Sequence, residues 1–209
     1  MRGKLITIEG CEGAGKSTQL ALLRAFLSER GVDAVFTREP GGTSVSERIR
    51  GLILDAANRE MTGRTELLLY AAARAQHIEE LIEPALARGA LVVCDRFSDS
   101  TLAYQGYARG MDLGLVRAAD SMGTGGVLPD LTLFLDIEPK AAFLRKGGAD
   151  SADRLENEGL AFHESVYRGY LEIARREPDR FVRVDAGPTE PERIFASILG
   201  VLKARGILL

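Results

Sequence analysis

The sequence predicts an α/β fold with a five-stranded parallel sheet and helices on both of its faces. Strand-like runs alternate with helical stretches along the chain, which is the pattern of βαβ units. Most of the strand-like runs are nearly continuous in apolar residues, as expected where helices cover both faces of a sheet. The 209 residues are enough for one well-buried domain and too few for two of comfortable size.

The expected elements follow one another in a regular order. The first strand is a short β-branched apolar run, and the five strands cover Leu5–Ile8, Ala34–Thr37, Leu91–Asp95, Leu131–Asp136 and Phe181–Asp185. Helical patterns cover Lys16–Arg30, Val45–Ala56, Arg64–Arg88, Asp112–Met122, Pro139–Leu144, Leu160–Arg176 and Pro191–Arg205. We expect Thr43 or Ser44 to cap the second helix. Left-handed glycines are expected to end three of the helices, at Gly31, Gly89 and Gly206.

One segment departs in composition from the rest of the chain. Residues Arg145–Arg154 are charged and glycine-rich and contain few apolar residues, so we expect a mobile surface segment there. The sequence contains no internal repeat and no interdomain linker. We therefore expect a single domain over residues 1–209.

The bulk composition excludes several classes of protein. A net charge of −3 argues against a large nucleic-acid partner, because such binding needs a basic surface. The two cysteines imply no disulfide framework, and Cys94 is expected to be a small core residue. The apolar run near the N-terminus is too short for the core of a signal peptide, so we expect none, and no apolar run approaches membrane-spanning length. We expect a cytoplasmic protein with no membrane partner.

A phosphate-binding motif is the strongest functional signal in the sequence. The pattern G-x-x-x-x-G-K-[ST] sits between the first strand and the first helix, where backbone N–H groups and the helix N-terminus attract phosphate oxygens. Lys16 is expected to reach the terminal phosphates, and the Ser17 hydroxyl to complete the Mg²⁺ shell. The non-functional alternative is a chance match to the motif in a glycine-rich turn. The predicted phosphate-binding residues are Gly10, Cys11, Glu12, Gly13, Ala14, Gly15, Lys16, Ser17 and Thr18.

Charged residues also follow the second and third strands. Asp95 and Arg96 end a buried strand at the sheet edge where ligands bind in parallel α/β folds. Asp95 is suited to holding Mg²⁺-bound water, and Arg96 to gripping phosphate oxygens. Arg38 follows the second strand, and Arg50 lies one helix later. The alternatives are a local Asp–Arg pair that closes the strand and two arginines on the solvated surface.

Two further groups of residues have the chemistry to bind a nucleobase and its sugar. Tyr70 and Arg74 are four residues apart in an expected helix, so a ring and a guanidinium share one face. The alternative is a core tyrosine beside a surface arginine. The second group follows Arg96 and combines hydroxyls, an amide and phenols, unless it is simply a polar helix start; it comprises Ser100, Thr101, Tyr104, Gln105 and Tyr107.

The remaining reactive side chains show no catalytic or metal-binding pattern. His77 and His163 have no metal-ligand spacing and no acid partner in the sequence, so we interpret both as helix-surface residues. No Cys/His cluster indicates zinc, and no G-x-S-x-G motif indicates acyl chemistry.

Taken together, these motifs resemble those of the bacterial thymidylate kinases, which phosphorylate dTMP to dTDP. The resemblance runs nearly end to end, through IEGCEGAGKST, TREPGGT, ELLLYAAARAQH, VVCDRF with STLAYQGYARG, LPDLTLFLD and DRLENEGLAFHESVYRGYLE. It implies a P-loop nucleoside monophosphate kinase fold with a short lid at about residues 145–158. It also implies ATP as the phosphoryl donor, Mg²⁺ as the cofactor, and a homodimer packed through long helices.

The resemblance assigns roles to residues that match the family motifs. It implies that Glu12 binds the sugar 3′-hydroxyl and that Gly13 marks the subclass in which the lid supplies the catalytic cation. Arg154 is the first candidate for that cation and Arg145 the second. The resemblance also implies that Tyr70 stacks on thymine, that Arg74 binds its carbonyl, and that Thr101 and Gln105 contact its edge. Tyr104 is expected to disfavour a 2′-hydroxyl, and Ser100 is assigned to the dTMP site as well. The acceptor phosphate is expected to bind Arg38, Arg50 and Arg96.

The chemistry of the acceptor explains why these residues are mostly cations. A phosphate monoester has its second pKa near 6, so the acceptor oxygen is already largely deprotonated at neutral pH and needs no general base. The barrier is instead the approach of two polyanions and the charge on the transferred group. We therefore assign Lys16, Arg96 and a lid arginine to catalysis, and Asp95 to the metal shell.

Two other functions are compatible with part of the sequence. One is a kinase for another nucleoside monophosphate, or for deoxynucleotides generally. The other is a GTPase-like switch, which would require an N-K-x-D string that the sequence lacks. The switch would also require D-x-x-G directly after a strand, whereas Asp120-Ser121-Met122-Gly123 lies at the end of an expected helix.

Overall fold

The computed structural model describes residues 2–146, 154–155 and 158–208. Its centre is a five-stranded sheet with the strand order β2-β3-β1-β4-β5. Every neighbouring pair is parallel, and Ile6 of β1 lies opposite Val93 of β3 and Leu131 of β4. The predicted sheet is therefore confirmed. The strands are β1 Leu5–Glu9, β2 Ala34–Arg38, β3 Leu91–Asp95, β4 Leu131–Asp136 and β5 Phe181–Asp185.

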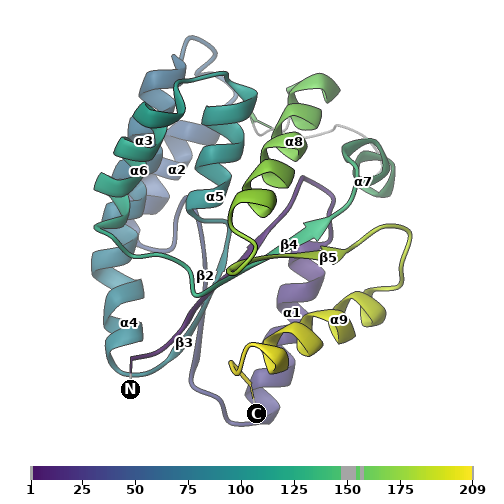
Figure 1. The fold of residues 1–209 in the computed structure, drawn as a ribbon. Coiled ribbons are helices and arrows are strands. Elements are labelled where there is room, and N and C mark those ends of the chain that lie inside the picture. The colour runs from purple at the N-terminus through teal and green to yellow at the C-terminus, as the bar shows by residue number, and fades with distance from the viewer. Residues whose placement is uncertain (1, 147–153, 156–157, 209) are drawn as a thin grey trace.

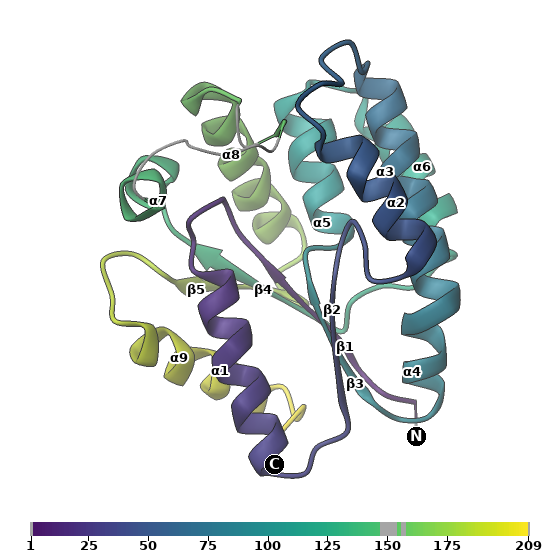
Figure 2. The same cartoon turned by 180° about the vertical axis from the view of Figure 1, so that it is seen from behind.

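Helices cover both faces of this sheet, as the apolar strands predict. Helices α1 and α9 lie on one face, and α3, α4, α5 and α8 lie on the other (Figures 1 and 2). The helical elements are α1 Lys16–Glu29, α2 Ser44–Leu54, α3 Gly63–His77, η1 Ile78–Ile82, α4 Glu83–Ala87, α5 Ser98–Thr101, η2 Leu102–Ala108, α6 Leu113–Thr124, α7 Pro139–Lys146, α8 Leu160–Arg176 and α9 Pro191–Ala204. No helix in the described ranges is long and apolar enough to cross a membrane.

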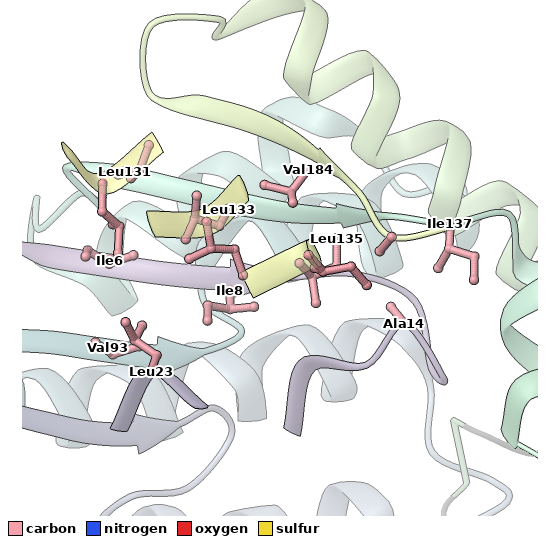
Figure 3. Close-up of a cluster of buried hydrophobic side chains, with 14 of the residues drawn as sticks. Ile6, Ile8, Ala14, Leu23, Val93, Leu131, Leu133, Leu135, Ile137 and Val184 are labelled. Atoms are coloured by element: carbon pink, nitrogen blue, oxygen red, sulfur yellow. The ribbon is translucent and has the colours of Figure 1, made fainter. Parts of the chain in front are cut away.

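The alternating side chains of the strands divide the core into two layers. Ile6, Ile8 and Leu133 point toward α1 and α9, where they pack with residues such as Leu23 and Ile198 (Figure 3). The intervening strand residues face the opposite helices, in two further apolar clusters. This second face also carries polar side chains at Thr7, Glu9 and Thr132, all fully buried. The core layer on this second face therefore contains buried polar groups, and one of them, Glu9, lies at the carboxyl end of β1.

The expected helix over residues 64–88 is divided into three elements. It changes to a π-helix at Ile78–Ile82 and returns to α-helix at Glu83–Ala87. Pro84 lies in this region and has no N–H with which to continue the regular hydrogen-bond ladder. A second difference is the helical segment formed by α5 and η2, where a polar helix start was only the alternative interpretation of the sequence. This segment places Ser100, Thr101 and Gln105 on a rigid element.

Several local predictions can be compared directly with the structure. Gly31, Gly89 and Gly206 have φ values of 65°, 89° and 63°, so the left-handed helix ends are confirmed. Thr43 occupies the N-cap of α2, although its hydroxyl donates to Ser46 Oγ at 3.0 Å and does not accept a backbone N–H. Arg145 belongs to α7, so the expected surface segment begins within a helix. Residues 147–153 and 156–157 of the expected lid lie outside the described residues.

Candidate active site

The carboxyl ends of β1, β2 and β3 open into one cavity of about 520 Å³. This is the edge at which parallel α/β sheets bind ligands. The cavity brings together most of the residues that the sequence singled out. Its walls include the predicted residues Glu12, Gly13, Gly15, Lys16, Ser17, Arg38, Arg50, Tyr70, Arg74, Asp95, Arg96, Ser100, Thr101, Tyr104, Gln105 and Arg145. Of the remaining predicted residues, Gly10, Cys11, Ala14 and Thr18 belong to the loop and helix behind this wall. Arg154 does not line the cavity.

The phosphate loop has the backbone geometry that its glycines allow. Gly13 has a φ of 77°, and a Cβ added there would lie 2.3 Å from the carbonyl oxygen of Ala142. Lys16 Nζ donates to the carbonyl oxygens of Gly10 at 3.2 Å and Cys11 at 3.3 Å. Burial lowers the pKa of Lys16, and the nearby charge of Arg96 lowers it further. The loop therefore folds around the ammonium group of Lys16 at the floor of the cavity.

Arg96 is held at the cavity wall by a strained backbone and several hydrogen bonds. Its φ of 68° lies in the left-handed region, which non-glycine residues adopt rarely. One guanidinium nitrogen, Nη1, donates to the carbonyl oxygen of Gly10 at 3.0 Å and to Tyr170 at 3.3 Å. The other, Nη2, lies 3.6 Å from Glu12 Oε2. These contacts place a fixed positive charge beside the phosphate loop.

Glu9 supports Arg96 from beneath the cavity. Its Oε1 accepts the backbone N–H of Phe97 at 2.7 Å, and its Oε2 accepts the hydroxyls of Ser100 at 2.6 Å and Tyr170 at 2.8 Å. Glu9 is fully buried. Burial raises its pKa to about 7, with a further increase from the carboxylate of Asp99, while Arg96 opposes the shift. The backbone of Phe97 and the hydroxyls of Ser100 and Tyr170, both of which contact Arg96, are thus bound to one carboxyl group.

Asp95 and Ser17 are the residues that suit a magnesium ion. Mg²⁺ in nucleotide sites usually keeps several waters and binds one or two protein oxygens together with phosphates. Oδ1 of Asp95 is buried and has no hydrogen-bond partner among the described residues, so it is free to accept a bond from a metal-bound water. Ser17 lines the same cavity. No group of three or more His, Cys, Asp or Glu side chains in the described ranges could hold a metal by itself.

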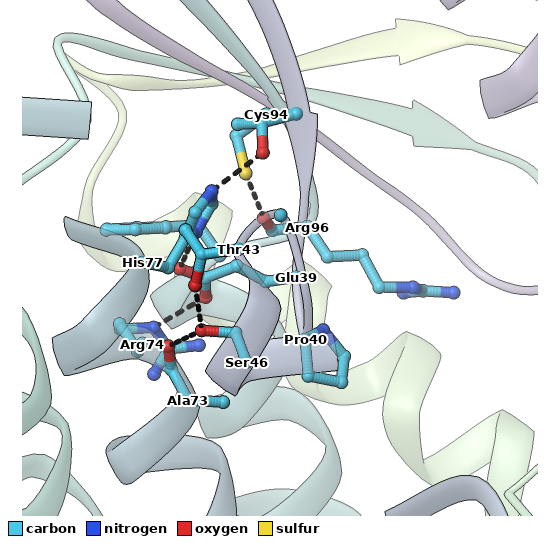
Figure 4. A network of polar contacts seen from close by, with 12 residues as sticks. Glu39, Pro40, Thr43, Ser46, Ala73, Arg74, His77, Cys94 and Arg96 are labelled. Atoms are coloured by element: carbon cyan, nitrogen blue, oxygen red, sulfur yellow. Dashed lines mark hydrogen bonds and ion pairs between the residues drawn. The ribbon is translucent and has the colours of Figure 1, made fainter. Parts of the chain in front are cut away.

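Arg74 forms the buried end of the cavity. Its Nε donates to Glu39 Oε2 at 2.7 Å (Figure 4). Its Nη1 donates to Asp120 Oδ1 at 2.6 Å and to Thr101 Oγ1 at 3.0 Å. The guanidinium is almost completely buried, and its two carboxylate partners raise its pKa despite that burial. Tyr70, one helical turn earlier, is half-buried and lines the same cavity. The alternative of a surface arginine is therefore wrong.

The assignment of both histidines to the surface was also wrong. His77 is fully buried, and its ring nitrogens lie 3.0 Å from Glu39 Oε1 and 2.7 Å from Thr37 Oγ1. The acid partner is therefore Glu39, which is distant in sequence. His163 is buried between the rings of Phe143 and Phe162, and it also lines the cavity. The local sequence does not predict the burial of either histidine, because the segments that cover them are distant in the chain. These segments are β2 for His77 and α7 for His163.

The two candidate lid arginines differ in position. Arg145 lies at the cavity wall, where its Nη2 donates to the carbonyl oxygens of Ala186 at 2.8 Å and of Gly187. Arg154 binds the carboxylate of Glu66 and donates from Nε to the carbonyl oxygen of Ile53 at 3.0 Å. In this conformation the guanidinium of Arg145 is the nearer to the phosphate loop, since Nη1 lies 3.8 Å from a Cβ built on Gly15.

Four acidic residues and one tyrosine complete the site and were missed from sequence. Each binds a residue that lines the cavity, and each is buried or nearly so. Only Glu9 carried a clear sequence signal, as a carboxylate at the end of the otherwise apolar first strand. They are Glu9, Glu39, Glu66, Asp120 and Tyr170.

A phosphate loop on the central strand of a parallel sheet, opening into a cavity walled by arginines, defines a P-loop kinase of nucleotides. The family model described as thymidylate kinase matches residues 8–198. The chain belongs to the thymidylate kinase family. It is accordingly an ATP-dependent kinase that converts dTMP to dTDP, a step of nucleotide biosynthesis.

Curated relatives and solved structures agree with this assignment. A thymidylate kinase of Desulfosudis oleivorans is 55% identical over 191 residues, covering 88% of this chain and 89% of the relative. A thymidylate kinase of Gloeobacter violaceus is 52% identical over 184 residues, covering 87% and 86%. The crystal structure of thymidylate kinase from Ehrlichia chaffeensis has a TM-score of 0.79 at 32% identity, and covers 97% of this chain and 99% of that one. The predicted family, fold and activity are confirmed.

Proposed function

We propose that the cavity at the ends of β1 and β3 is where the γ-phosphoryl group passes from ATP to dTMP. The observation that carries this proposal is that the phosphate loop and the buried Arg74 open on the same cavity. One end of that cavity suits a polyphosphate, and the other suits a planar base. In this arrangement the loop from Gly10 to Thr18 binds ATP, and Lys16 stabilises the charge on the transferred group.

The base and sugar of dTMP occupy the end of the cavity near α3 and η2. Tyr70 stacks on thymine, and Arg74 donates to a ring carbonyl oxygen. Thr101 and Gln105 contact the base edge, with Ser100 close by, while Glu12 accepts the 3′-hydroxyl. Tyr104 is buried beneath Arg96, whose guanidinium carbon lies 5.3 Å from the ring centroid, and it leaves little room for a 2′-hydroxyl.

The acceptor phosphate lies among Arg38, Arg50 and Arg96. Arg50 is oriented by a hydrogen bond of 2.8 Å from Nη1 to the carbonyl oxygen of Pro40. Arg38 pairs with Glu47 at 2.9 Å. Because its side chain is also exposed and lines the cavity, a ligand at the cavity mouth can reach it. Because the phosphate monoester is already largely ionised at neutral pH, these cations neutralise it and no residue removes a proton. Arg96 lies between donor and acceptor and binds the oxygens of both.

Asp95 and Ser17 hold the magnesium ion of the ATP complex. Ser17 would bind it directly, and Asp95 would bind it through water, for which its unpartnered Oδ1 is suited. When bound, Mg²⁺ neutralises charge on the β- and γ-phosphates of the donor. Asp95 therefore acts as a metal-shell residue and not as a general base.

The lid at about residues 145–158 closes over the phosphates as part of the single domain over residues 1–209. Closure would exclude water, which otherwise competes with dTMP as the acceptor. The lid also supplies a cation in the absence of an arginine after Glu12. Arg145 and Arg154 are the two candidates, and Arg154 would first have to leave Glu66.

The enzyme acts in the cytoplasm as a homodimer. Leu68 of α3 is 57% exposed and Met122 of α6 is 84% exposed, and these two helices pack side by side. Exposed apolar side chains on adjoining long helices suit an interface with a second copy. We expect light scattering to give the mass of a dimer for the parent protein and a lower mass for Leu68→Glu. Leu144→Glu, on α7, is the matched control because Leu144 is 77% exposed away from these helices.

An assay of ADP release with ATP and a panel of nucleoside monophosphates tests the proposal. We expect turnover with dTMP well above that with dUMP, dCMP, dGMP or dAMP. Similar rates across the panel would favour a broad deoxynucleotide kinase. Hydrolysis of GTP without an acceptor would favour the GTPase-like switch and would contradict the proposed site.

A further inference from the structure

Glu66 of α3 is a buried carboxylate that binds Gln105, a residue of the proposed base site. Its side chain is 1% exposed, and its Oε1 accepts a hydrogen bond of 2.8 Å from Nε2 of Gln105. Gln105 is itself 1% exposed and lines the cavity. Glu66 is not among the lining residues. It therefore reaches a ligand only through another side chain.

Two arginines keep Glu66 in its charged form. Arg109 donates to both carboxylate oxygens at 3.3 Å, and Arg154 donates to Oε2. Burial raises the pKa of Glu66, but the bonds from Gln105, Arg154 and Arg109 outweigh burial and bring it below its ordinary value. A charged carboxylate has no proton to donate, so every group that faces it must be a donor.

This restriction decides which end of the Gln105 amide faces the cavity. A glutamine amide has a donating NH₂ group and an accepting carbonyl oxygen, and the two ends are nearly equal in shape. Only the NH₂ group can bind Glu66. The side-chain oxygen of Gln105, Oε1, then points away from Glu66, and it accepts no hydrogen bond from any residue in the described ranges.

We propose that Glu66 is a positioning residue that makes Gln105 offer a hydrogen-bond acceptor to the base. The inference depends on the proposed binding of dTMP in this cavity. Thymine and uracil carry an N–H donor at ring position N3, whereas cytosine carries an acceptor there. With Gln105 fixed by Glu66, cytosine would bring two acceptors together and leave both unsatisfied.

Glu66→Gln is the variant that tests this role with little change in volume. A neutral amide at position 66 accepts or donates, so Gln105 is free to turn. We expect the ratio of kcat/KM for dTMP to that for dCMP to fall at least about tenfold, mainly through a higher KM for dTMP. Arg109→Gln is the matched control, because it removes one of the two arginines but leaves Arg154 to keep Glu66 charged and bound to Gln105. It should keep the ratio within about threefold of the parent value.

A reversed pair supplies a rescue that a purely structural role would not produce. In Glu66→Gln with Gln105→Glu, the carboxylate at position 105 accepts from the amide at position 66 and still offers an oxygen to the base. We expect this double variant to recover at least part of the dTMP preference that Glu66→Gln loses. A folded Glu66→Gln enzyme with an unchanged ratio, or an equal loss in Arg109→Gln, would overturn the inference.

The same measurements separate this inference from the proposed function. If the parent enzyme shows no preference for dTMP over dCMP, the proposed base site itself is wrong. If the parent discriminates and folded Glu66→Gln does so equally, only the role of Glu66 is wrong. If Glu66→Gln fails to fold, Glu66→Asp replaces it. That variant keeps the charge but shortens the reach to Gln105, and an unchanged ratio there would also overturn the inference.

Discussion

Replacing Glu9 with glutamine should change how the stability of the enzyme depends on pH. Glu9 is fully buried beneath Arg96, and burial raises its pKa from 4.5 to about 7. Between these two values the folded state binds a proton that the unfolded state has lost. The proton therefore favours folding at low pH, and the folded state loses this advantage as the pH rises toward 7. Glutamine is neutral at every pH and removes this dependence.

The size of the effect follows from the two pKa values. Between about pH 5 and about pH 8.5, proton release from Glu9 should lower the unfolding free energy of the parent by about 2.5 kcal/mol. Glu9→Gln has no such proton and should not show this loss. The difference in unfolding free energy, variant minus parent, should thus become more positive by about 2.5 kcal/mol across this range. At the acidic end the amide still accepts one hydrogen bond and donates another, so the variant should fold.

Urea unfolding at the two pH values measures this difference directly. Glu172→Gln is a suitable control, because Glu172 lies at the surface and its arginine neighbours lower its pKa to about 2, below the range measured. The control and the parent should show parallel pH dependence. Equal pH dependence in Glu9→Gln and the parent would show that Glu9 is already ionised at acidic pH, and would refute the reasoning from burial.

Three further predictions follow from individual contacts. Arg96→Ala should lower kcat by about 10³-fold or more without unfolding the protein, and near-normal turnover in the ADP-release assay would contradict its role. Gly13→Ala should lower the unfolding free energy by about 1–3 kcal/mol, because its φ is 77° and the new Cβ would lie 2.3 Å from the oxygen of Ala142; an unchanged thermal melt would count against that strain. Asp99→Asn should cost about 2–3 kcal/mol in urea unfolding, since Asp99 is fully buried and pairs with Arg180 at 2.7 Å. No loss would mean that water solvates Arg180 instead.

The sequence predicted the sheet well because each strand is an apolar run with a clear end. All five expected strands agree with the structure to within one residue, and Leu160–Arg176 is predicted with its observed bounds. Helix continuity was harder to predict. Residues 64–88 have one apolar periodicity, and the change to a π-helix near Pro84 depends on local hydrogen bonding that periodicity does not reveal.

The sequence also identified most of the cavity wall but few of the residues behind it. Motif residues such as Lys16 and Arg96 occupy fixed places relative to strand ends, so their convergence could be expected from parallel topology. Glu39 directly follows β2 and His77 ends α3, so the two residues are far apart in the sequence. No local pattern predicts that they contact each other in the fold. The same reason explains why Arg154 was expected near the phosphates, whereas it binds Glu66 in the structure.

The buried carboxylates show a common principle in the construction of this site. Glu9, Glu39 and Glu66 come from different elements, and each accepts hydrogen bonds from a side chain that lines the cavity or supports its wall. Because charged carboxylates only accept, they fix the direction in which Arg74 and Gln105 present their remaining groups. Glu9 differs, since a pKa of about 7 lets it also hold a proton. The base end of the cavity is therefore fixed by charge, while the floor beneath Arg96 remains sensitive to pH.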